Sequence, residues 1–158
     1  MYKIGNSTDV HNLIYQPNSL QKLGGCEFRS DYVVQAHSDG DVILHALAES
    51  VLGALCLGDL GDHFGDKDPN NKNLNSIKIL DYALEHMKQM NYQINNVDLT
   101  IICEKIFFKD KKKIIKDFLV NYLKCDFINI KATRFEEKEN NKIVCQSTVL
   151  LTKIDTKK

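Results

Sequence analysis

The chain has 158 residues, 43% apolar and 27% charged, which is ordinary for a globular protein and predicts a single domain over residues 1–158. Lys plus Arg and Asp plus Glu each number 21, so a formal net charge of zero argues against nucleic-acid and anionic-membrane partners. No stretch approaches the roughly 20 apolar residues of a membrane-spanning helix. A polar motif begins by Asn6 and leaves no room for a signal peptide. We expect a cytoplasmic protein, or one of a plastid-like organelle if a targeting segment was removed.

The cysteines are scattered and form no CxxC pair, so they predict neither a thiolate zinc site nor a redox pair. Their odd number in a chain of this size indicates reduced thiols in a cytosol-like compartment. Cys56 and Cys103 lie in apolar runs, and we expect both to be buried.

The first part of the chain predicts two short strands around an irregular segment. Tyr2 to His11 reads as a strand that runs into a polar turn. Residues 13–32 have no clear periodicity, although Gly24-Gly25 is a turn signal. Val33 and Val34 then predict a second short strand.

The middle of the chain predicts two helices around a loop. Asp41 to Leu55 is almost continuously apolar, which is typical of a helix buried on most sides. Asp59 to Leu74 predicts a long polar loop, and loops of that length are often functional. Asn75 or Ser76 is suited to cap the next helix. Its inward face is predicted to carry Ile77, Leu80, Leu84, Met87 and Met90.

The last third predicts strands over 97–103, 127–133 and 142–154, with a helix over 111–124 between the first two. We expect the last two strands to pair with each other. Helices that interleave with strands favour an α/β (α+β) fold, with helices packed on one face of a mixed β-sheet.

Asp9 and His11 point to chemistry, because residues two apart on an extended segment share one face. A catalytic zinc ion takes three protein ligands, commonly histidine nitrogen and carboxylate oxygen, and keeps one position open. His45 is our candidate for the third ligand, since its polar ring lies on an otherwise apolar helix. Two alternatives remain open at this point: His45 as a core histidine bonded to a carbonyl, and Asp9-x-His11 as a surface pair.

Six segments of the chain resemble 2-C-methyl-D-erythritol 2,4-cyclodiphosphate synthases of the non-mevalonate isoprenoid pathway. These segments are Asp9-Val10-His11, 36–46 (AHSDGDVILHA), 57–61 (LGDLG), 66–69 (DKDP), 96–102 (NVDLTII) and 129–133 (NIKAT). They cover nearly the whole chain in order, and the segment around His37 and His45 is highly specific.

The resemblance implies a metal-assisted phosphoryl transfer. Such enzymes convert 4-diphosphocytidyl-2-C-methyl-D-erythritol 2-phosphate to the 2,4-cyclodiphosphate and release cytidine monophosphate (CMP). It implies that Asp9, His11 and His45 bind one Zn²⁺ per subunit, and that a second cation, Mg²⁺ or Mn²⁺, joins the substrate diphosphate. It also implies a homotrimer with its sheets facing the three-fold axis and active sites between neighbouring subunits.

The resemblance further implies a set of residues around the substrate. His37, Ser38, Asp59 and Thr133 are the expected catalytic residues. The expected substrate-binding residues are His37, Ser38, Asp59, Gly61, Asp66, Thr133, Arg134 and Glu136. Of these, Asp59 and Gly61 would hold the sugar hydroxyls, and Glu136 or Glu137 would contact the second cation. For Asp66, a solvated turn residue remains an alternative.

The chain departs from the family at the nucleotide end. Arg134 and Phe135 stand where the family has two threonines, and Ile106-Phe107 replaces a Pro-Lys pair in the cytidine pocket. Arg134 could donate to phosphate in place of a lost hydroxyl. These losses raise the alternative of a zinc-retaining homologue with lost or altered catalysis that binds a phosphorylated ligand or partner. A zinc-dependent phosphate-ester hydrolase is a third hypothesis.

Overall fold

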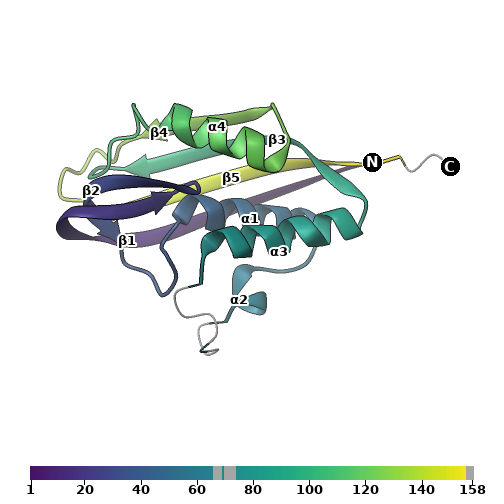
Figure 1. Ribbon diagram of the computed structural model, residues 1–158, viewed down its shortest axis with the longest axis horizontal. Coiled ribbons are helices and arrows are strands. Elements are labelled where there is room, and N and C mark those ends of the chain that lie inside the picture. Colours follow the sequence, from purple (N-terminus) through teal and green to yellow (C-terminus); the bar gives the residue numbers. More distant parts are fainter. Residues whose placement is uncertain (66–68, 70–73, 156–158) are drawn as a thin grey trace.

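A computed structural model describes residues 1–65, 69 and 74–155. Its elements are β1 (Tyr2–Leu23), β2 (Cys26–Val34), α1 (Val42–Ala54), α2 (Leu60–His63), α3 (Ser76–Gln89), β3 (Tyr92–Cys103), α4 (Lys112–Leu123), β4 (Ile128–Thr133) and β5 (Lys142–Lys153). The strands form one sheet in the order β2-β1-β5-β3-β4 (Figure 1). β3 and β4 run parallel and the other neighbours antiparallel, which confirms the predicted mixed sheet.

The helices cover one face of this sheet, as predicted. Along β5, every second residue from Ile143 to Leu151 is buried, and the residues between them are more exposed. α1 packs against β1 and β5, and α3 packs against α1 (Figure 1). Gly5 faces α1 so closely that an added Cβ would lie 2.0 Å from the carbonyl oxygen of Ser50. Its neighbour Ile4 consequently points to the uncovered face and is 70% exposed.

The expectation of an irregular segment over residues 13–32 is wrong, because β1 continues to Leu23 and forms a hairpin with β2. The hairpin turns at Gly24-Gly25, as predicted, and both glycines have positive φ. Most side chains between Ile14 and Ser19 are exposed, so this part of β1 lacks the alternation of apolar and polar residues that announces a strand. The pairing with β2 is also irregular between Tyr15 and Ser19, and cross-strand contacts such as that of Tyr15 with Tyr32 leave no pattern in the sequence.

The last two strands do not pair with each other, contrary to prediction. β3, α4 and β4 form a crossover unit that joins two parallel strands. β5 then returns on the other side of β3 and pairs with β3 and β1. It is thus the central strand of the sheet.

Three local expectations also need correction. Met90 is 39% exposed, because α3 ends at Gln89 and Met90 is only its C-cap. Cys56 is exposed beyond the end of α1 with φ of 62°, whereas Cys103 is buried as expected. The loop predicted from Asp59 to Leu74 contains the short helix α2. No helix in the described part of the chain is long and apolar enough to span a membrane.

Candidate metal centre and substrate site

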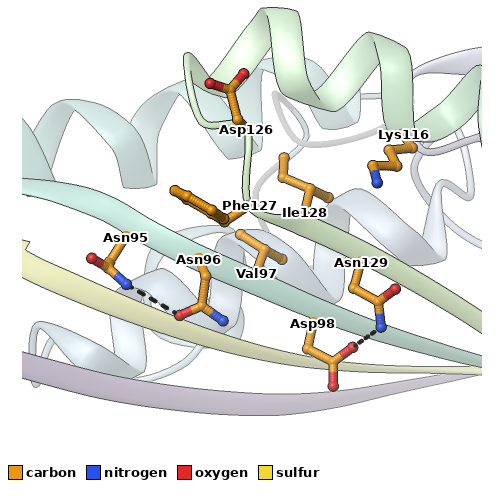
Figure 2. Close-up of a pocket in the computed structure, with 9 residues that line it drawn as sticks. All are labelled: Asn95, Asn96, Val97, Asp98, Lys116, Asp126, Phe127, Ile128 and Asn129. Atoms are coloured by element: carbon orange, nitrogen blue, oxygen red, sulfur yellow. Dashed lines mark hydrogen bonds between the residues drawn. The ribbon is translucent and has the colours of Figure 1, made fainter.

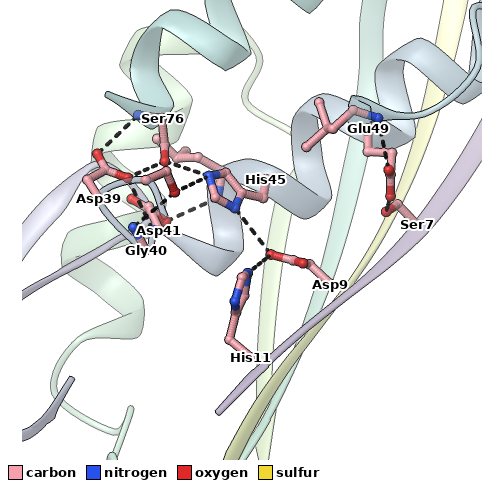
Figure 3. A network of polar contacts seen from close by, with 12 residues as sticks. Ser7, Asp9, His11, Asp39, Gly40, Asp41, His45, Glu49 and Ser76 are labelled. Carbon is pink, nitrogen blue, oxygen red and sulfur yellow. Dashed lines mark hydrogen bonds and ion pairs between the residues drawn. The ribbon is translucent and has the colours of Figure 1, made fainter. Parts of the chain in front are cut away.

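Asp9, His11 and His45 come together where β1 passes α1 (Figure 3). The Oδ2 atom of Asp9 lies 3.1 Å from Nε2 of His11 and 3.4 Å from Nδ1 of His45. One ligand atom from each residue lies within 4.8 Å of the others. Two imidazoles and one carboxylate fit a divalent metal ion.

The electrostatics of this group keep Asp9 in its charged form. Burial alone would raise the pKa of Asp9, but hydrogen bonds and charges from His11 and His45 outweigh it and lower the pKa to about 2. The hydrogen bond to Asp9 raises the pKa of His11 above its ordinary value, against the opposing effect of burial. Asp9 therefore remains a carboxylate at neutral pH, ready to ligate.

The local sequence explains how α1 presents His45. Asp41 is the N-cap of α1, and its carboxylate accepts from the backbone N–H of Leu44 at 3.1 Å. The same carboxylate accepts from Gly24 and Gly25 at 2.8 and 2.7 Å. One buried aspartate thus joins the start of α1 to the hairpin turn and fixes the helix four residues before His45.

Two serine hydroxyls face the other ring nitrogen of His45. Nε2 lies 2.8 Å from Oγ of Ser76 and 3.3 Å from Oγ of Ser38. Ser38 and the exposed His37 lie in the loop between β2 and α1. The structure therefore places Ser38 beside the metal group through its contact with His45, and His37 one residue before it in the same loop.

α2 carries two more predicted residues, Asp59 and Gly61. Asp59 is its N-cap: Oδ1 accepts from the backbone N–H of Asp62 at 3.0 Å, and the side chain of Asp62 accepts from Asp59 in return. The backbone N–H of Leu60 donates to Oε1 of Glu49 at 3.1 Å, one helical turn after His45 on α1. Glu49 therefore holds the start of α2 close to the metal group.

The end of α2 is held by His63. Its Nε2 lies 2.7 Å from the carbonyl oxygen of Leu57, and its Nδ1 lies 2.9 Å from the hydroxyl of Tyr82 on α3. A neutral imidazole that donates from Nε2 and accepts at Nδ1 satisfies both contacts. α2 is thus fixed at both ends, to α1 and to α3.

The predicted nucleotide-end residues lie elsewhere. Thr133, Arg134 and Glu136 are exposed at the C-terminal end of β4. Arg134 donates from Nη2 to Oε1 of the buried Glu104, and its guanidinium carbon lies 5.1 Å from the ring centroid of Phe107. The second oxygen of Glu104, Oε2, is buried and has no hydrogen-bond partner among the described residues.

The sheet register separates the two ends of the candidate site. Asp9 pairs with Cys145, Cys145 with Ile101, and Ile101 with Ala132. Three strand spacings place the Cα atoms of Asp9 and Ala132 roughly 14 Å apart. One chain thus brings Asp59 and Gly61 on α2 close to the metal group, and it leaves the predicted nucleotide-binding residues at a distance from it.

Two other places lie outside this site. Asp66 falls outside the described residues, so its predicted contact with the sugar is not located. An open hollow of about 840 Å³ lies beside the first half of β3 and the start of β4. Asp98, Lys116 and the exposed Phe127 are among the residues that line it (Figure 2). It lies at the opposite end of these strands from Glu104 and Arg134.

Sequence reasoning missed several residues that shape the site. In the sequence, Ser76 indicates only a helix cap. Glu49 is a polar residue in an apolar helix, and nothing indicates which residue it contacts. Asp39 belongs to the recognised segment 36–46, but nothing in the pattern indicated its partner. The spacing of Glu49 one turn after His45 was the one local signal that could have identified it.

Comparisons with known proteins agree with this geometry. The YgbB family model matches residues 2–152. A 2-C-methyl-D-erythritol 2,4-cyclodiphosphate synthase of Leptospira borgpetersenii is 45% identical over 139 residues, 87% of this chain and 86% of the relative. That of Mycoplasmoides gallisepticum is 40% identical over 149 residues, 94% of this chain and 96% of the relative. A solved IspF–CDP complex of Plasmodium falciparum has a TM-score of 0.83 and 30% identity, covering 98% of this chain and 97% of that one.

Proposed function

The chain belongs to the YgbB family, whose curated relatives are 2-C-methyl-D-erythritol 2,4-cyclodiphosphate synthases, and we propose that it catalyses their reaction. It converts 4-diphosphocytidyl-2-C-methyl-D-erythritol 2-phosphate to the 2,4-cyclodiphosphate in non-mevalonate isoprenoid biosynthesis. CMP leaves, so the enzyme is a phosphorus–oxygen lyase. The observation that carries this proposal is the group of Asp9, His11 and His45 beside Ser38 and α2.

In the reaction, an oxygen of the substrate's 2-phosphate attacks the β-phosphorus of the diphosphate. The bond from that phosphorus to the CMP oxygen breaks, and CMP keeps the electron pair. Both reacting groups are anionic and must approach in line, so positioning provides much of the catalysis. A zinc ion held by Asp9, His11 and His45 would supply positive charge that offsets this repulsion and polarises a phosphate oxygen.

The residues around the metal centre orient the substrate. His37 and Ser38 donate to phosphate oxygens, and the nearby N-terminus of α1 adds a favourable dipole. Asp59 has committed one carboxylate oxygen to the backbone of Asp62. Its remaining acceptor capacity is available to the methylerythritol hydroxyls, and the backbone at Gly61 lies one residue into the same short helix.

The nucleotide end has a different set of residues. Thr133 and Arg134 donate to the distal phosphates, since hydroxyl and guanidinium groups both suit phosphate oxygens. Glu136, or Glu137 if the local alignment shifts by one residue, would help to hold a second cation, Mg²⁺ or Mn²⁺, which would offset the negative charge of the substrate diphosphate. Carboxylate oxygens are suitable ligands for such hard cations.

A homotrimer would complete the site. The roughly 14 Å between the two ends within one chain is bridged if the nucleotide end of one subunit faces the metal end of its neighbour. The uncovered face of the sheet carries exposed apolar side chains, including Tyr2, Ile4 and Val10, and is suited to surround a three-fold axis. Mixing inactive His45→Ala and Thr133→Ala chains should then restore part of the activity, because some interfacial sites would be intact.

The five cysteines are all free thiols, which is consistent with the cytoplasmic location that we propose. The substrate diphosphocytidyl compound is the expected small-molecule partner, and we propose neither a nucleic-acid nor a membrane partner.

Turnover tests the proposed function. The zinc-loaded protein, incubated with the substrate and Mg²⁺, should release CMP at a rate far above a His45→Ala control. Tight binding of cytidine diphosphate (CDP) without CMP release would contradict catalysis and favour the ligand-binding homologue.

A further inference from the structure

The side of His45 that faces away from the metal group is enclosed by protein. His45 is 8% exposed and Ser76 is fully buried. The short distance of 2.8 Å between Nε2 of His45 and Oγ of Ser76 joins α1 to the first residue of α3 (Figure 3). A buried ring nitrogen without a partner is unfavourable, so this contact constrains the ring.

Asp39 constrains Ser76 in turn. The hydroxyl of Ser76 donates to Oδ1 of Asp39, and the backbone N–H of Ser76 donates to Oδ2 at 3.0 Å. Lys22 lies 3.7 Å from the same Oδ2. Both oxygens of one carboxylate therefore hold one serine, and the serine hydroxyl proton is committed to Asp39.

This commitment decides the direction of the hydrogen bond to His45. Because the hydroxyl of Ser76 donates its one proton to Asp39, it can only accept from the imidazole. Nε2 of His45 must then carry the proton, which leaves a lone pair on Nδ1. Nδ1 is the nitrogen that faces Asp9 at 3.4 Å, in the candidate metal group.

We propose that Ser76 is the positioning residue of the metal centre, holding His45 in the ligating tautomer and orientation through the relay from Asp39 to Ser76 to His45. Outer-shell partners of metal-bound histidines act in this way. The inference rests on the metal centre of the proposed function. It adds a residue at the start of α3, which is thereby coupled to a metal ligand.

The relay also explains how Ser38 is available to the substrate. Ser38 lies 3.3 Å from the same Nε2, and it also accepts from the backbone N–H of Gly40 at 3.3 Å. With Ser76 closer and fully buried, Ser38 can turn toward a phosphate without leaving the imidazole proton unpaired. Ser76 thus positions the metal ligand His45, and the hydroxyl of Ser38 is available to bind the substrate.

Zinc affinity and the His45 tautomer test this inference without any activity measurement. Zinc affinity is measured by competition with a chromophoric chelator for the wild type, Ser76→Ala, Ser76→Thr and Ser50→Ala. Ser50 on α1 is the matched control, because it is also fully buried and its hydroxyl lies 2.8 Å from that of Ser147, which is not a member of the metal group. Long-range proton–nitrogen NMR of the metal-free proteins reports which nitrogen of His45 carries the proton.

We expect Ser76→Ala to bind zinc about 10- to 100-fold more weakly than the wild type and to show a mixture of His45 tautomers. Ser76→Thr keeps the hydroxyl and should recover most of the affinity, and Ser50→Ala should bind zinc as the wild type does. Equal affinity and the same tautomer in Ser76→Ala and Ser50→Ala would overturn the positioning role. A wild-type protein that binds no zinc would instead refute the metal centre, and the relay's role with it.

Discussion

The Oδ2 atom of Asp9 lies 3.1 Å from Nε2 of His11, two residues along the same strand. β1 makes this contact by placing both side chains on the helix-covered face, and α1 adds His45 from above. A single carboxylate oxygen is thus shared by two imidazoles, an arrangement that a bound divalent cation would replace with three metal–ligand bonds.

Asp9→Asn should abolish zinc binding at ordinary concentrations. The amide has nearly the same shape but no negative charge, so it cannot balance the positive charge of the zinc ion. We expect zinc affinity to fall by more than about 100-fold, since even an outer-shell partner contributes 10- to 100-fold. Chelator competition measures this. Asp31→Asn is the control, because the Asp31 carboxylate accepts from the backbone N–H of Asn18 at the irregularity in the pairing of β1 and β2, and Asp31 is not a member of the metal group; equal losses in the two variants would count against the site.

The raised pKa of His11 predicts opposite pH dependences for the metal-free and zinc-loaded proteins. In the metal-free protein, protonated His11 stabilises the fold. This contribution is full below about pH 6.5, the pKa of His11 in the unfolded chain, and it is lost as pH rises through the raised pKa of His11 in the folded protein. Zinc binds deprotonated His11, so its affinity rises over the same pH window.

Thermal unfolding from about pH 6 to about pH 8, with and without excess zinc, measures both trends. Stabilisation by zinc should increase with pH, and His11→Gln should flatten the slope of the metal-free protein. A zinc effect that does not change with pH would contradict His11 as a ligand.

Arg134→Ala should destabilise the protein as well as weaken nucleotide binding. It removes the partner of Glu104, which is 7% exposed and whose Oε2 already has no partner in the described part of the chain. We expect a loss on the order of 1–3 kcal/mol in the free energy of unfolding. The double variant Arg134→Ala/Glu104→Gln should recover much of that stability, because the buried charge is gone.

Denaturant unfolding and CDP titration separate these two effects. If Arg134 also donates to phosphate, the double variant should regain stability but not CDP affinity. Restoration of both would show that Arg134 serves Glu104 alone.

Tyr82→Phe should act at a distance through α2. It removes the hydroxyl that lies 2.9 Å from Nδ1 of His63 and so loosens the segment that carries Asp59 and Gly61. We expect a loss of about 1 kcal/mol in stability and a KM that rises roughly fivefold, with zinc affinity unchanged. Tyr122→Phe is the matched control, since it loses a comparable hydroxyl contact, to Asp81, on the side of α3 that faces α4. A KM equal in both variants would contradict the role of Tyr82.

The metal group could be predicted from sequence because its residues obey local rules. Asp9 and His11 follow the two-residue period of a strand, and His45 is a polar residue in an apolar helix. The resemblance of residues 36–46 to the cyclodiphosphate synthases links His45 to Asp9 and His11 as one predicted metal site. The turn of the β1–β2 hairpin could be predicted at Gly24-Gly25, but the continuation of β1 could not, since its residues 14–18 are all exposed and carry no periodic pattern. The position of β5 depends on long-range pairing.

For a related reason, the sequence does not predict the roles of Ser76, Asp39 and Glu49. Their roles arise where three elements meet, and spacing within any one element says nothing of that meeting. Arg134 was predicted as a phosphate donor, and that role remains a prediction; its partner Glu104 follows from the parallel pairing of β3 and β4. Polar contacts between elements become visible only once the sheet order is known.

Product analysis by phosphorus-31 NMR in oxygen-18 water tests the central claim most directly. The zinc-loaded protein, given 4-diphosphocytidyl-2-C-methyl-D-erythritol 2-phosphate and Mg²⁺, should yield CMP and a cyclic diphosphate, neither containing oxygen-18. The label stays in the solvent because the attacking oxygen comes from the substrate's own 2-phosphate. A linear phosphate product that carries oxygen-18, or unchanged substrate, would contradict the account.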